Sequence, residues 1–249
     1  MKKFVKIAAI VVAVVLVIAL VAPMVLRGKI AEIVKREANA MLDARLDFEK
    51  LDISLLRHFP RASLDLKGLT LVGEEPFAGD TIVAAQRISV VVNVMSLFGD
   101  EGFEVTKIIL SEPALHAHKL ADGAVSWDVM KPSEAPAEEV PAEEPEPSSF
   151  RLSVRDFRIS DAAIRYEDDS TGMRFSTAPL SLRLRGDMSA DQTDLDLRLT
   201  AKGMRLVSGG IPMLSGAEAE LDAVIAADLA NSRFTFSQNK LRLNAIEVG

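Results

Sequence analysis

An uninterrupted apolar run near the start of the chain limits what the rest can fold into. Residues 7–26 read IAAIVVAVVLVIALVAPMVL and contain neither a charge nor a polar side chain. A helix rises about 1.5 Å per residue, so this run spans roughly 30 Å, the thickness of the hydrocarbon core of a bilayer. In lipid, the backbone must satisfy its own hydrogen bonds. The run therefore predicts a transmembrane helix that anchors the chain.

A cleaved secretory signal is the alternative interpretation, because three lysines precede the run. A signal peptide has an apolar core of about 7–15 residues, followed by a small-x-small cleavage site. This run is longer, and Leu20 stands where the site before Pro23 needs a small residue. Basic residues flank both ends, but a short basic tail normally stays in the cytoplasm. We expect residues 1–26 to form a cytoplasmic tail and an uncleaved inner-membrane anchor, with residues 27–249 in the periplasm.

Composition excludes several classes of site. The chain has no cysteine, which excludes a disulfide framework, a thiolate metal site and a cysteine nucleophile. The net charge is −7, and six glutamates lie within residues 133–147, a stretch without a basic residue. The remaining chain is almost neutral and lacks the clustered basic face of a nucleic-acid-binding protein.

Residues 27–45 have the spacing of an amphipathic helix. Its apolar residues are Ile30, Ile33, Val34, Ala38, Met41 and Leu42. The simplest interpretation is that this helix leaves the membrane and packs on the first sheet. It could instead cap the mouth of the following domain or lie at the membrane interface.

From Leu46 the apolar period changes to two, the spacing of a strand with one buried face. A pattern Φ-x-Φ-x-x-Φ-x-Φ, in which Φ is apolar, recurs four times in the chain. The copies cover residues 46–53, 64–71, 103–110 and 152–159. The extra central residue would turn the second half to the other face unless a β-bulge or bend absorbs it. The pattern therefore predicts curved strands that share one design.

The third and fourth copies belong to a longer internal repeat. VTKIILSEPALHA (105–117) aligns with VRDFRISDAAIRY (154–166) at an offset of 49 residues. Repeats of this kind are typical of stacked or solenoid-like arrays. Two ordinary β-meanders whose aliphatic strands resemble each other are the alternative.

The remaining chain predicts further strands, including one over 81–95 and a short one over 125–129. Aliphatic and polar residues alternate in them, which is typical of an antiparallel sheet with one solvated face. We expect a first β unit over 46–130 and a second over 150–249 that continues in a longer protein. Between them, residues 131–149 are rich in Pro and Glu and are expected to be a disordered linker. The predicted fold is thus mainly β, a curved, antiparallel, repeat-like sheet with an open groove.

This order of anchor, helix and one-sided β repeats resembles the AsmA family of Gram-negative envelope proteins, in the form found in Bacteroidetes-type bacteria. The most specific stretches are LSVRDFRISDAAIRYEDDSTGMRF (152–175) and TDLDLRLTAKGMRLVSGGIPML (193–214). The resemblance covers essentially the whole chain. It implies inner-membrane anchoring, a periplasmic body and a role in outer-membrane lipid homeostasis. By similarity to bridge-like lipid-transfer proteins, it also implies a long β groove for acyl chains. It supplies no catalytic residues.

A lipid groove needs only an open apolar trough. Burying apolar surface gains about 25 cal/mol per Å², so a two-carbon acyl segment gains roughly 1.6 kcal/mol on entering it. We therefore expect phospholipid ligands that move along the groove between the inner and outer membranes. The candidate lining residues are Leu64, Leu66, Val105, Ile108, Leu110, Val154, Phe157, Ile159, Ile164, Leu182 and Leu184.

Two other functions are considered. In the first, the protein is a structural or assembly factor for outer-membrane proteins, without lipid transport, and its sheet edges pair with client strands. Outer-membrane or other envelope proteins would then be its partners. The second is an envelope hydrolase, but the sequence contains neither a glycine-rich phosphate loop nor Gly-x-Ser-x-Gly. We expect no enzymatic activity and no cofactor.

Few residues are candidates for metal binding. His116 and His118 lie two apart on a strand and could form half of a metal site, but the sequence places no third ligand. Glu167, Asp168 and Asp169 lack the alternate spacing of a calcium loop. We expect solvated histidines, a polar turn at the acids, and no metal.

Overall fold

The computed structural model describes residues 28–29, 31–58, 61–93, 103–131, 150–188, 190, 192–228, 231, 233–244 and 246–248. The predicted anchor at 7–26 lies outside these residues, as does nearly all of the predicted linker. Within the described ranges, no helix has both the length and the hydropathy that spanning a membrane requires.

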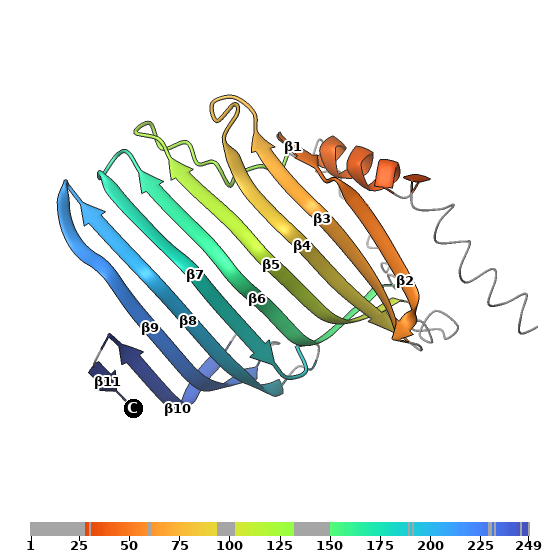
Figure 1. Ribbon diagram of the computed structural model, residues 1–249. Coiled ribbons are helices and arrows are strands. Elements are labelled where there is room, and N and C mark those ends of the chain that lie inside the picture. The colour runs from red at the N-terminus through yellow and green to blue at the C-terminus, as the bar shows by residue number, and fades with distance from the viewer. Residues whose placement is uncertain are drawn as a thin grey trace, which may run out of the picture.

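Strands dominate the described chain and form a single sheet (Figure 1). They are β1 (Ala44–Asp47), β2 (Lys50–His58), β3 (Arg61–Gly73), β4 (Thr81–Asn93), β5 (Phe103–Lys119), β6 (Phe150–Asp168), β7 (Met173–Arg185), β8 (Gln192–Ser208), β9 (Ile211–Asp228), β10 (Arg233–Leu243) and β11 (Ile246–Val248). Their order is β1-β3-β4-β5-β6-β7-β8-β9-β10-β11, and β2 also pairs with β3. The described strands therefore form an open sheet, as predicted, in which each strand mostly lies beside its neighbour in sequence.

One junction corrects the prediction of a wholly antiparallel sheet, because β5 and β6 pair in parallel. Their register runs from Lys107 opposite Asp156 to Lys119 opposite Asp168, which is the 49-residue offset of the sequence repeat. The two repeat copies therefore lie side by side in register. The pair is parallel because β6 starts at the same end of the sheet as β5.

The predicted bends are confirmed in three of the four copies of the strand pattern. In β3, Gly68 has a left-handed φ of 62° at the centre of the copy, between Lys67, which pairs with Arg87, and Leu69, which pairs with Ala85. In β5, Thr106 is an extra residue between the pairs Val105–Val92 and Lys107–Val91. The register between β5 and β6 shifts again at the centre of the fourth copy.

The copy at 46–53 was predicted to form one bent strand, which is wrong. It divides into β1 and β2, which pair with successive parts of β3. The separation falls at Phe48 and Glu49, where Phe48 N–H donates to the side chain of Asp47 and Glu49 N–H donates to Lys67 O.

The segment before the sheet is helical at 28–29 and 31–41, a little shorter than the predicted 27–45 because Ala44 begins β1. Asn39 fixes the helix to this edge strand. Its side-chain amide donates to Leu46 O at 2.9 Å, and its side-chain oxygen accepts from Leu46 N at 2.7 Å. The helix thus supplies hydrogen bonds that a neighbouring strand would otherwise supply.

The short strand predicted at 125–129 is also wrong. This segment forms turns, with isolated bridges from Val125 to Lys119 and from Met130 to Leu42. Because Lys131 N–H also donates to Met41 O at 3.0 Å, the segment connects the end of β5 to the end of the helix.

Candidate functional site

Large apolar side chains, all but one of them aliphatic, form two rows across the sheet, which we call the apolar rows. Paired residues on neighbouring strands project to the same face, so the register defines each row. The first row contains Leu64, Val90, Ile108, Phe157, Leu184 and Leu197. The second contains Leu66, Ile88, Leu110, Ile159, Leu182, Leu199 and Leu221. The two rows give one face of β3–β9 a continuous aliphatic surface.

No second layer of structure covers this surface in the described part of the chain. The substantial contacts between strands all join neighbours within the sheet. None of the described large side chains is less than 2 % exposed. The core of a β-sandwich would contain such side chains, because two inner faces interdigitate there. The apolar rows therefore border open space.

Small residues form a third line beside the second row, which we call the crease. They are Ala85, Pro113, Ala162, Ala201 and Ala219, in successive register apart from Leu180 of β7. Left-handed residues occur next to this line, at Glu112 in β5, Asp161 in β6 and Gly203 in β8. Side chains this small let the strands bend without a clash. The crease separates the apolar rows from the far ends of the strands.

The candidate residues fall into three places. Eight lie in the apolar rows, namely Leu64, Leu66, Ile108, Leu110, Phe157, Ile159, Leu182 and Leu184. Ile164 lies beyond the crease, between Leu115 and Thr177. Val105 and Val154 are 4 % and 3 % exposed and belong to a buried cluster against which Met188 packs. These two valines pack the end of the sheet and do not border open space.

Five residues of the apolar rows were missed as candidates. They are Ile88, Val90, Leu197, Leu199 and Leu221. The same alternation of apolar and polar residues could have identified them. Six of the eight candidates on the rows belong to the recurring eight-residue pattern, and Leu182 and Leu184 were named from alternation alone.

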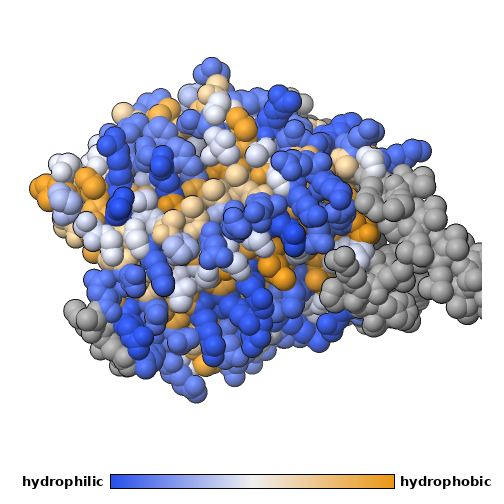
Figure 2. Space-filling model, viewed as in Figure 1, coloured by the Kyte–Doolittle hydropathy of each residue, from blue (hydrophilic) through white to orange (hydrophobic). Residues whose placement is uncertain are grey.

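The opposite face of the sheet is polar. Figure 2 shows a face of the molecule on which hydrophilic side chains predominate, with apolar patches between them. Arg158, Arg183 and Arg198 lie directly opposite one another on β6, β7 and β8. Asp156 Oδ2 forms ion pairs with the guanidinium of Arg183 and with Lys107 Nζ, each at 3.1 Å. Burial opposes its ionisation, but hydrogen bonds from these two bases outweigh burial and hold the pKa of Asp156 below its usual value.

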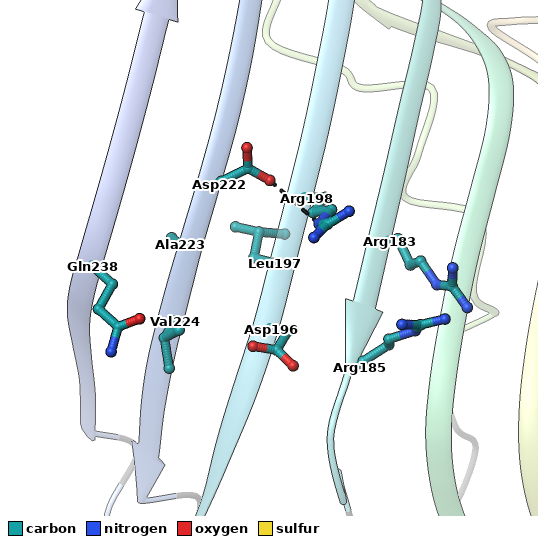
Figure 3. Close-up of a pocket in the computed structure, with 9 residues that line it drawn as sticks. All are labelled: Arg183, Arg185, Asp196, Leu197, Arg198, Asp222, Ala223, Val224 and Gln238. Atoms are coloured by element: carbon teal, nitrogen blue, oxygen red, sulfur yellow. Dashed lines mark ion pairs between the residues drawn. The ribbon is translucent and has the colours of Figure 1, made fainter. Parts of the chain in front are cut away.

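A shallow hollow of about 280 Å³ lies on this polar face over β7–β10 (Figure 3). Arg183, Arg185 and Asp196 line it, together with Arg198, whose Nε lies 3.4 Å from Asp222 Oδ1. Charges of both signs surround the hollow, and Leu197, Ala223 and Val224 complete its lining together with Gln238. None of the eleven residues predicted to line a lipid groove borders it.

The two histidines lie at the end of β5 on the polar face. His118 Nε2 lies 3.0 Å from Asp169 Oδ2, and the rings of His116 and His118 are stacked 5.9 Å apart. His116 Nε2 lies 3.8 Å from Glu167 Oε1 and has no hydrogen-bond partner. Across the described residues, no group of three or more histidine or acidic side chains could hold a metal ion.

The acidic segment after β6 forms a turn at 169–172, as predicted. Asp168 accepts hydrogen bonds from the Ser170 hydroxyl and from the backbone N–H groups of Ser170 and Thr171. The hydroxyl makes the largest contribution, and together with the backbone donors it lowers the pKa of Asp168 to about 2 despite partial desolvation. The carboxylate closes the turn.

A protein-family model described as the AsmA family matches residues 1–244. Comparisons with curated proteins and with solved structures gave no match.

Proposed function

The chain belongs to the AsmA family, and from this premise we propose that it binds phospholipids on its apolar face and conducts them between the inner and outer membranes. The observation that carries the proposal is the pair of uncovered apolar rows across β3–β9. The apolar run at 7–26 supports a single-pass inner-membrane anchor with a cytoplasmic N-terminus and a periplasmic body. In this proposal the protein supports outer-membrane lipid homeostasis and performs no covalent chemistry.

The rows are long enough to hold an acyl chain. Neighbouring strands lie about 4.8 Å apart, so the rows extend roughly 29 Å across the seven strands β3–β9. Half of a bilayer core, which one acyl tail spans, is about 15 Å thick. A tail can therefore lie along the rows and slide without leaving apolar surface. Each CH₂ group that leaves water contributes about 0.8 kcal/mol, so the hydrophobic effect alone can hold the tail.

The first test is native mass spectrometry with lipid extraction on residues 27–249, purified without the anchor. Stoichiometric phospholipid should co-purify with the protein. A stably folded protein that carries no lipid would contradict the proposal.

Substitutions on the apolar face should remove the bound lipid. Leu182→Glu places a carboxylate among the aliphatic residues of the second row, and Ile164→Glu places one beyond the crease, beside Leu115. A bound acyl chain would bury this carboxylate without a partner, which costs the desolvation energy of the charge. We expect at least a tenfold loss of lipid occupancy. Leu182→Met, which conserves volume, and Thr200→Lys, on the exposed polar face of β8, should retain lipid.

The site of contact can be tested in the full chain within its membrane. A photo-crosslinking residue at Leu199 should capture phospholipid, and one at Thr200, on the other face of the same strand, should not. Equal capture at the two positions would show that the apolar face is not the binding surface. Unchanged occupancy in folded Leu182→Glu and Ile164→Glu would remove these two residues from the site.

One observation favours the alternative function, an assembly factor for outer-membrane proteins. β10 pairs with β11 only over residues 241–243, so its remaining outer edge is unpaired among the described strands. An unpaired edge can accept a strand from a client protein. A crosslinker at Thr235 that captures outer-membrane proteins, in a protein that carries no lipid, would favour this function.

A further inference from the structure

The helix before β1 turns only one side toward the sheet. Ala31, Lys35, Ala38, Asn39 and Leu42 are half-buried, at the i, i+4, i+7, i+8 spacing of one helix face. Lys35 pairs with Asp47 and its ammonium lies 4.5 Å above the ring of Phe48. Apart from Leu42 at its end, the side of the helix that faces the sheet carries small and polar residues. Ile33, Val34 and Met41 are therefore left for another partner.

Those apolar residues form an exposed surface, which we call the helix patch. Ile33, Val34 and Met41 are 48 %, 39 % and 60 % exposed, and Met130 is 58 % exposed. Met130 extends the patch because its segment bridges to Leu42, next to Met41. Exposed large apolar side chains that gather on one side of a helix mark an interaction surface.

The sequence next to the helix indicates what covers the patch. The apolar run ends at Leu26, and the first described helical residue is Gly28. Two residues of extended chain reach about 7 Å, so the start of the helix is tethered within that distance of the membrane surface. Met41 lies about 20 Å further along the helix, so only a helix parallel to the membrane brings the whole patch against it.

Charges of both signs surround the patch. Lys29 is exposed at the start of the helix, and Lys131 is exposed beside Met130, where each can meet a lipid phosphate. Glu37 is exposed between Ile33 and Met41, and its carboxylate is neutralised by Arg36 at 2.8 Å.

We propose that the helix lies on the phospholipid bilayer with the helix patch in its surface. This inference rests on the anchoring proposed above and adds a second membrane contact to it. The contact would hold the β1–β3 end of the apolar rows against the membrane, where a lipid tail can pass from the leaflet to Leu64 and Leu66.

The absence of native cysteine permits a direct test on the full chain. Single cysteines at Val34, Met41 and Met130 would carry an environment-sensitive NBD label in vesicles of phosphatidylethanolamine and phosphatidylglycerol. An interfacial helix sits about 5–10 Å into the headgroup boundary. These labels should therefore lose fluorescence to lipids spin-labelled near the headgroup and be shielded from aqueous iodide. A label at Arg36, on the polar side of the helix, should show the reverse.

A double substitution distinguishes binding through the helix patch from anchoring through residues 7–26. Val34→Gln combined with Met41→Gln should abolish lipid quenching of a label at Met130, while a label at Val15 in the anchor stays quenched. If the Val15 label is lipid-quenched and the patch labels are as open to iodide as the Arg36 label, this inference is overturned and the anchoring stands. If the Val15 label is also open to iodide, both are overturned.

Discussion

Single carboxylate side chains in this sheet each bind several donors, in the turns and on the polar face. Asp168 is the clearest case, because one side chain accepts three hydrogen bonds that close the turn between β6 and β7. Its second oxygen lies 3.4 Å from Lys119 on β5. One residue therefore connects the parallel pair to the antiparallel hairpin that follows it.

The lowered pKa of Asp168 predicts a dependence of stability on pH. Its pKa is about 2 in the folded chain and ordinarily 3.8, so its contribution is fully present above about pH 4 and is lost as the pH falls through 2. Wild type should be more stable than Asp168→Asn in urea at pH 5, and the difference should shrink between pH 4 and pH 2. Asp194→Asn, at an exposed position in β8, controls for the loss of charge alone. A difference that stays constant down to pH 2 would contradict the assignment.

At the scale of the element, the bend in β3 depends on one glycine. Gly68 has φ of 62°, and a Cβ at this position would lie 2.6 Å from the side chain of Glu49. The side chain of Glu49 can move aside, but the left-handed backbone cannot be relieved.

Gly68→Ala should therefore destabilise the protein by about 1–2 kcal/mol, the cost of a left-handed non-glycine residue. Chemical denaturation measures this directly. Gly28→Ala is the matched control, since a Cβ there meets nothing within 4 Å and alanine favours a helix. Equal stability of Gly68→Ala and wild type would mean that β3 bends elsewhere.

These elements also show what sequence could predict. The bends of β3, β5 and β6 were predictable because side-chain alternation is a local property, and an extra residue must be absorbed where it occurs. The parallel pairing of β5 and β6 was not predicted, although the 49-residue repeat contained its register. The direction in which β6 pairs with β5 depends on the end of the sheet at which β6 begins, after residues 131–149. No local sequence pattern predicts that end.

The sequence also predicted only some of the residues of the candidate site correctly. Leu182 and Leu184 were placed on the aliphatic face because alternation gives the face directly. Val105 and Val154 have the same alternation, yet they are buried, since Met188 from the turn after β7 packs beside them. That contact joins residues far apart in sequence, and alternation carries no information about it.

At the scale of the whole molecule, the sheet has one solvated polar face and one uncovered apolar face. Most folded domains bury their apolar sheet faces between two layers. Here the second layer is missing from the described chain, so water contacts part of every aliphatic row. A ligand that covers these rows should do what a second layer does in other proteins, and stabilise the folded state.

Phospholipid should therefore raise the thermal stability of residues 27–249. A ligand that binds only the folded state at a hundred times its Kd adds about 2.7 kcal/mol to the free energy of unfolding. For a chain of this size, that corresponds to a rise in Tm of roughly 5–10 °C. Calorimetry with a short-chain phosphatidylcholine below its micelle concentration measures the shift, and Leu182→Glu should remove it while Leu182→Met preserves it. A Tm that does not respond in wild type would mean that the apolar face is covered in solution, and the assembly function would then explain the open edge of β10 better than lipid transport explains the rows.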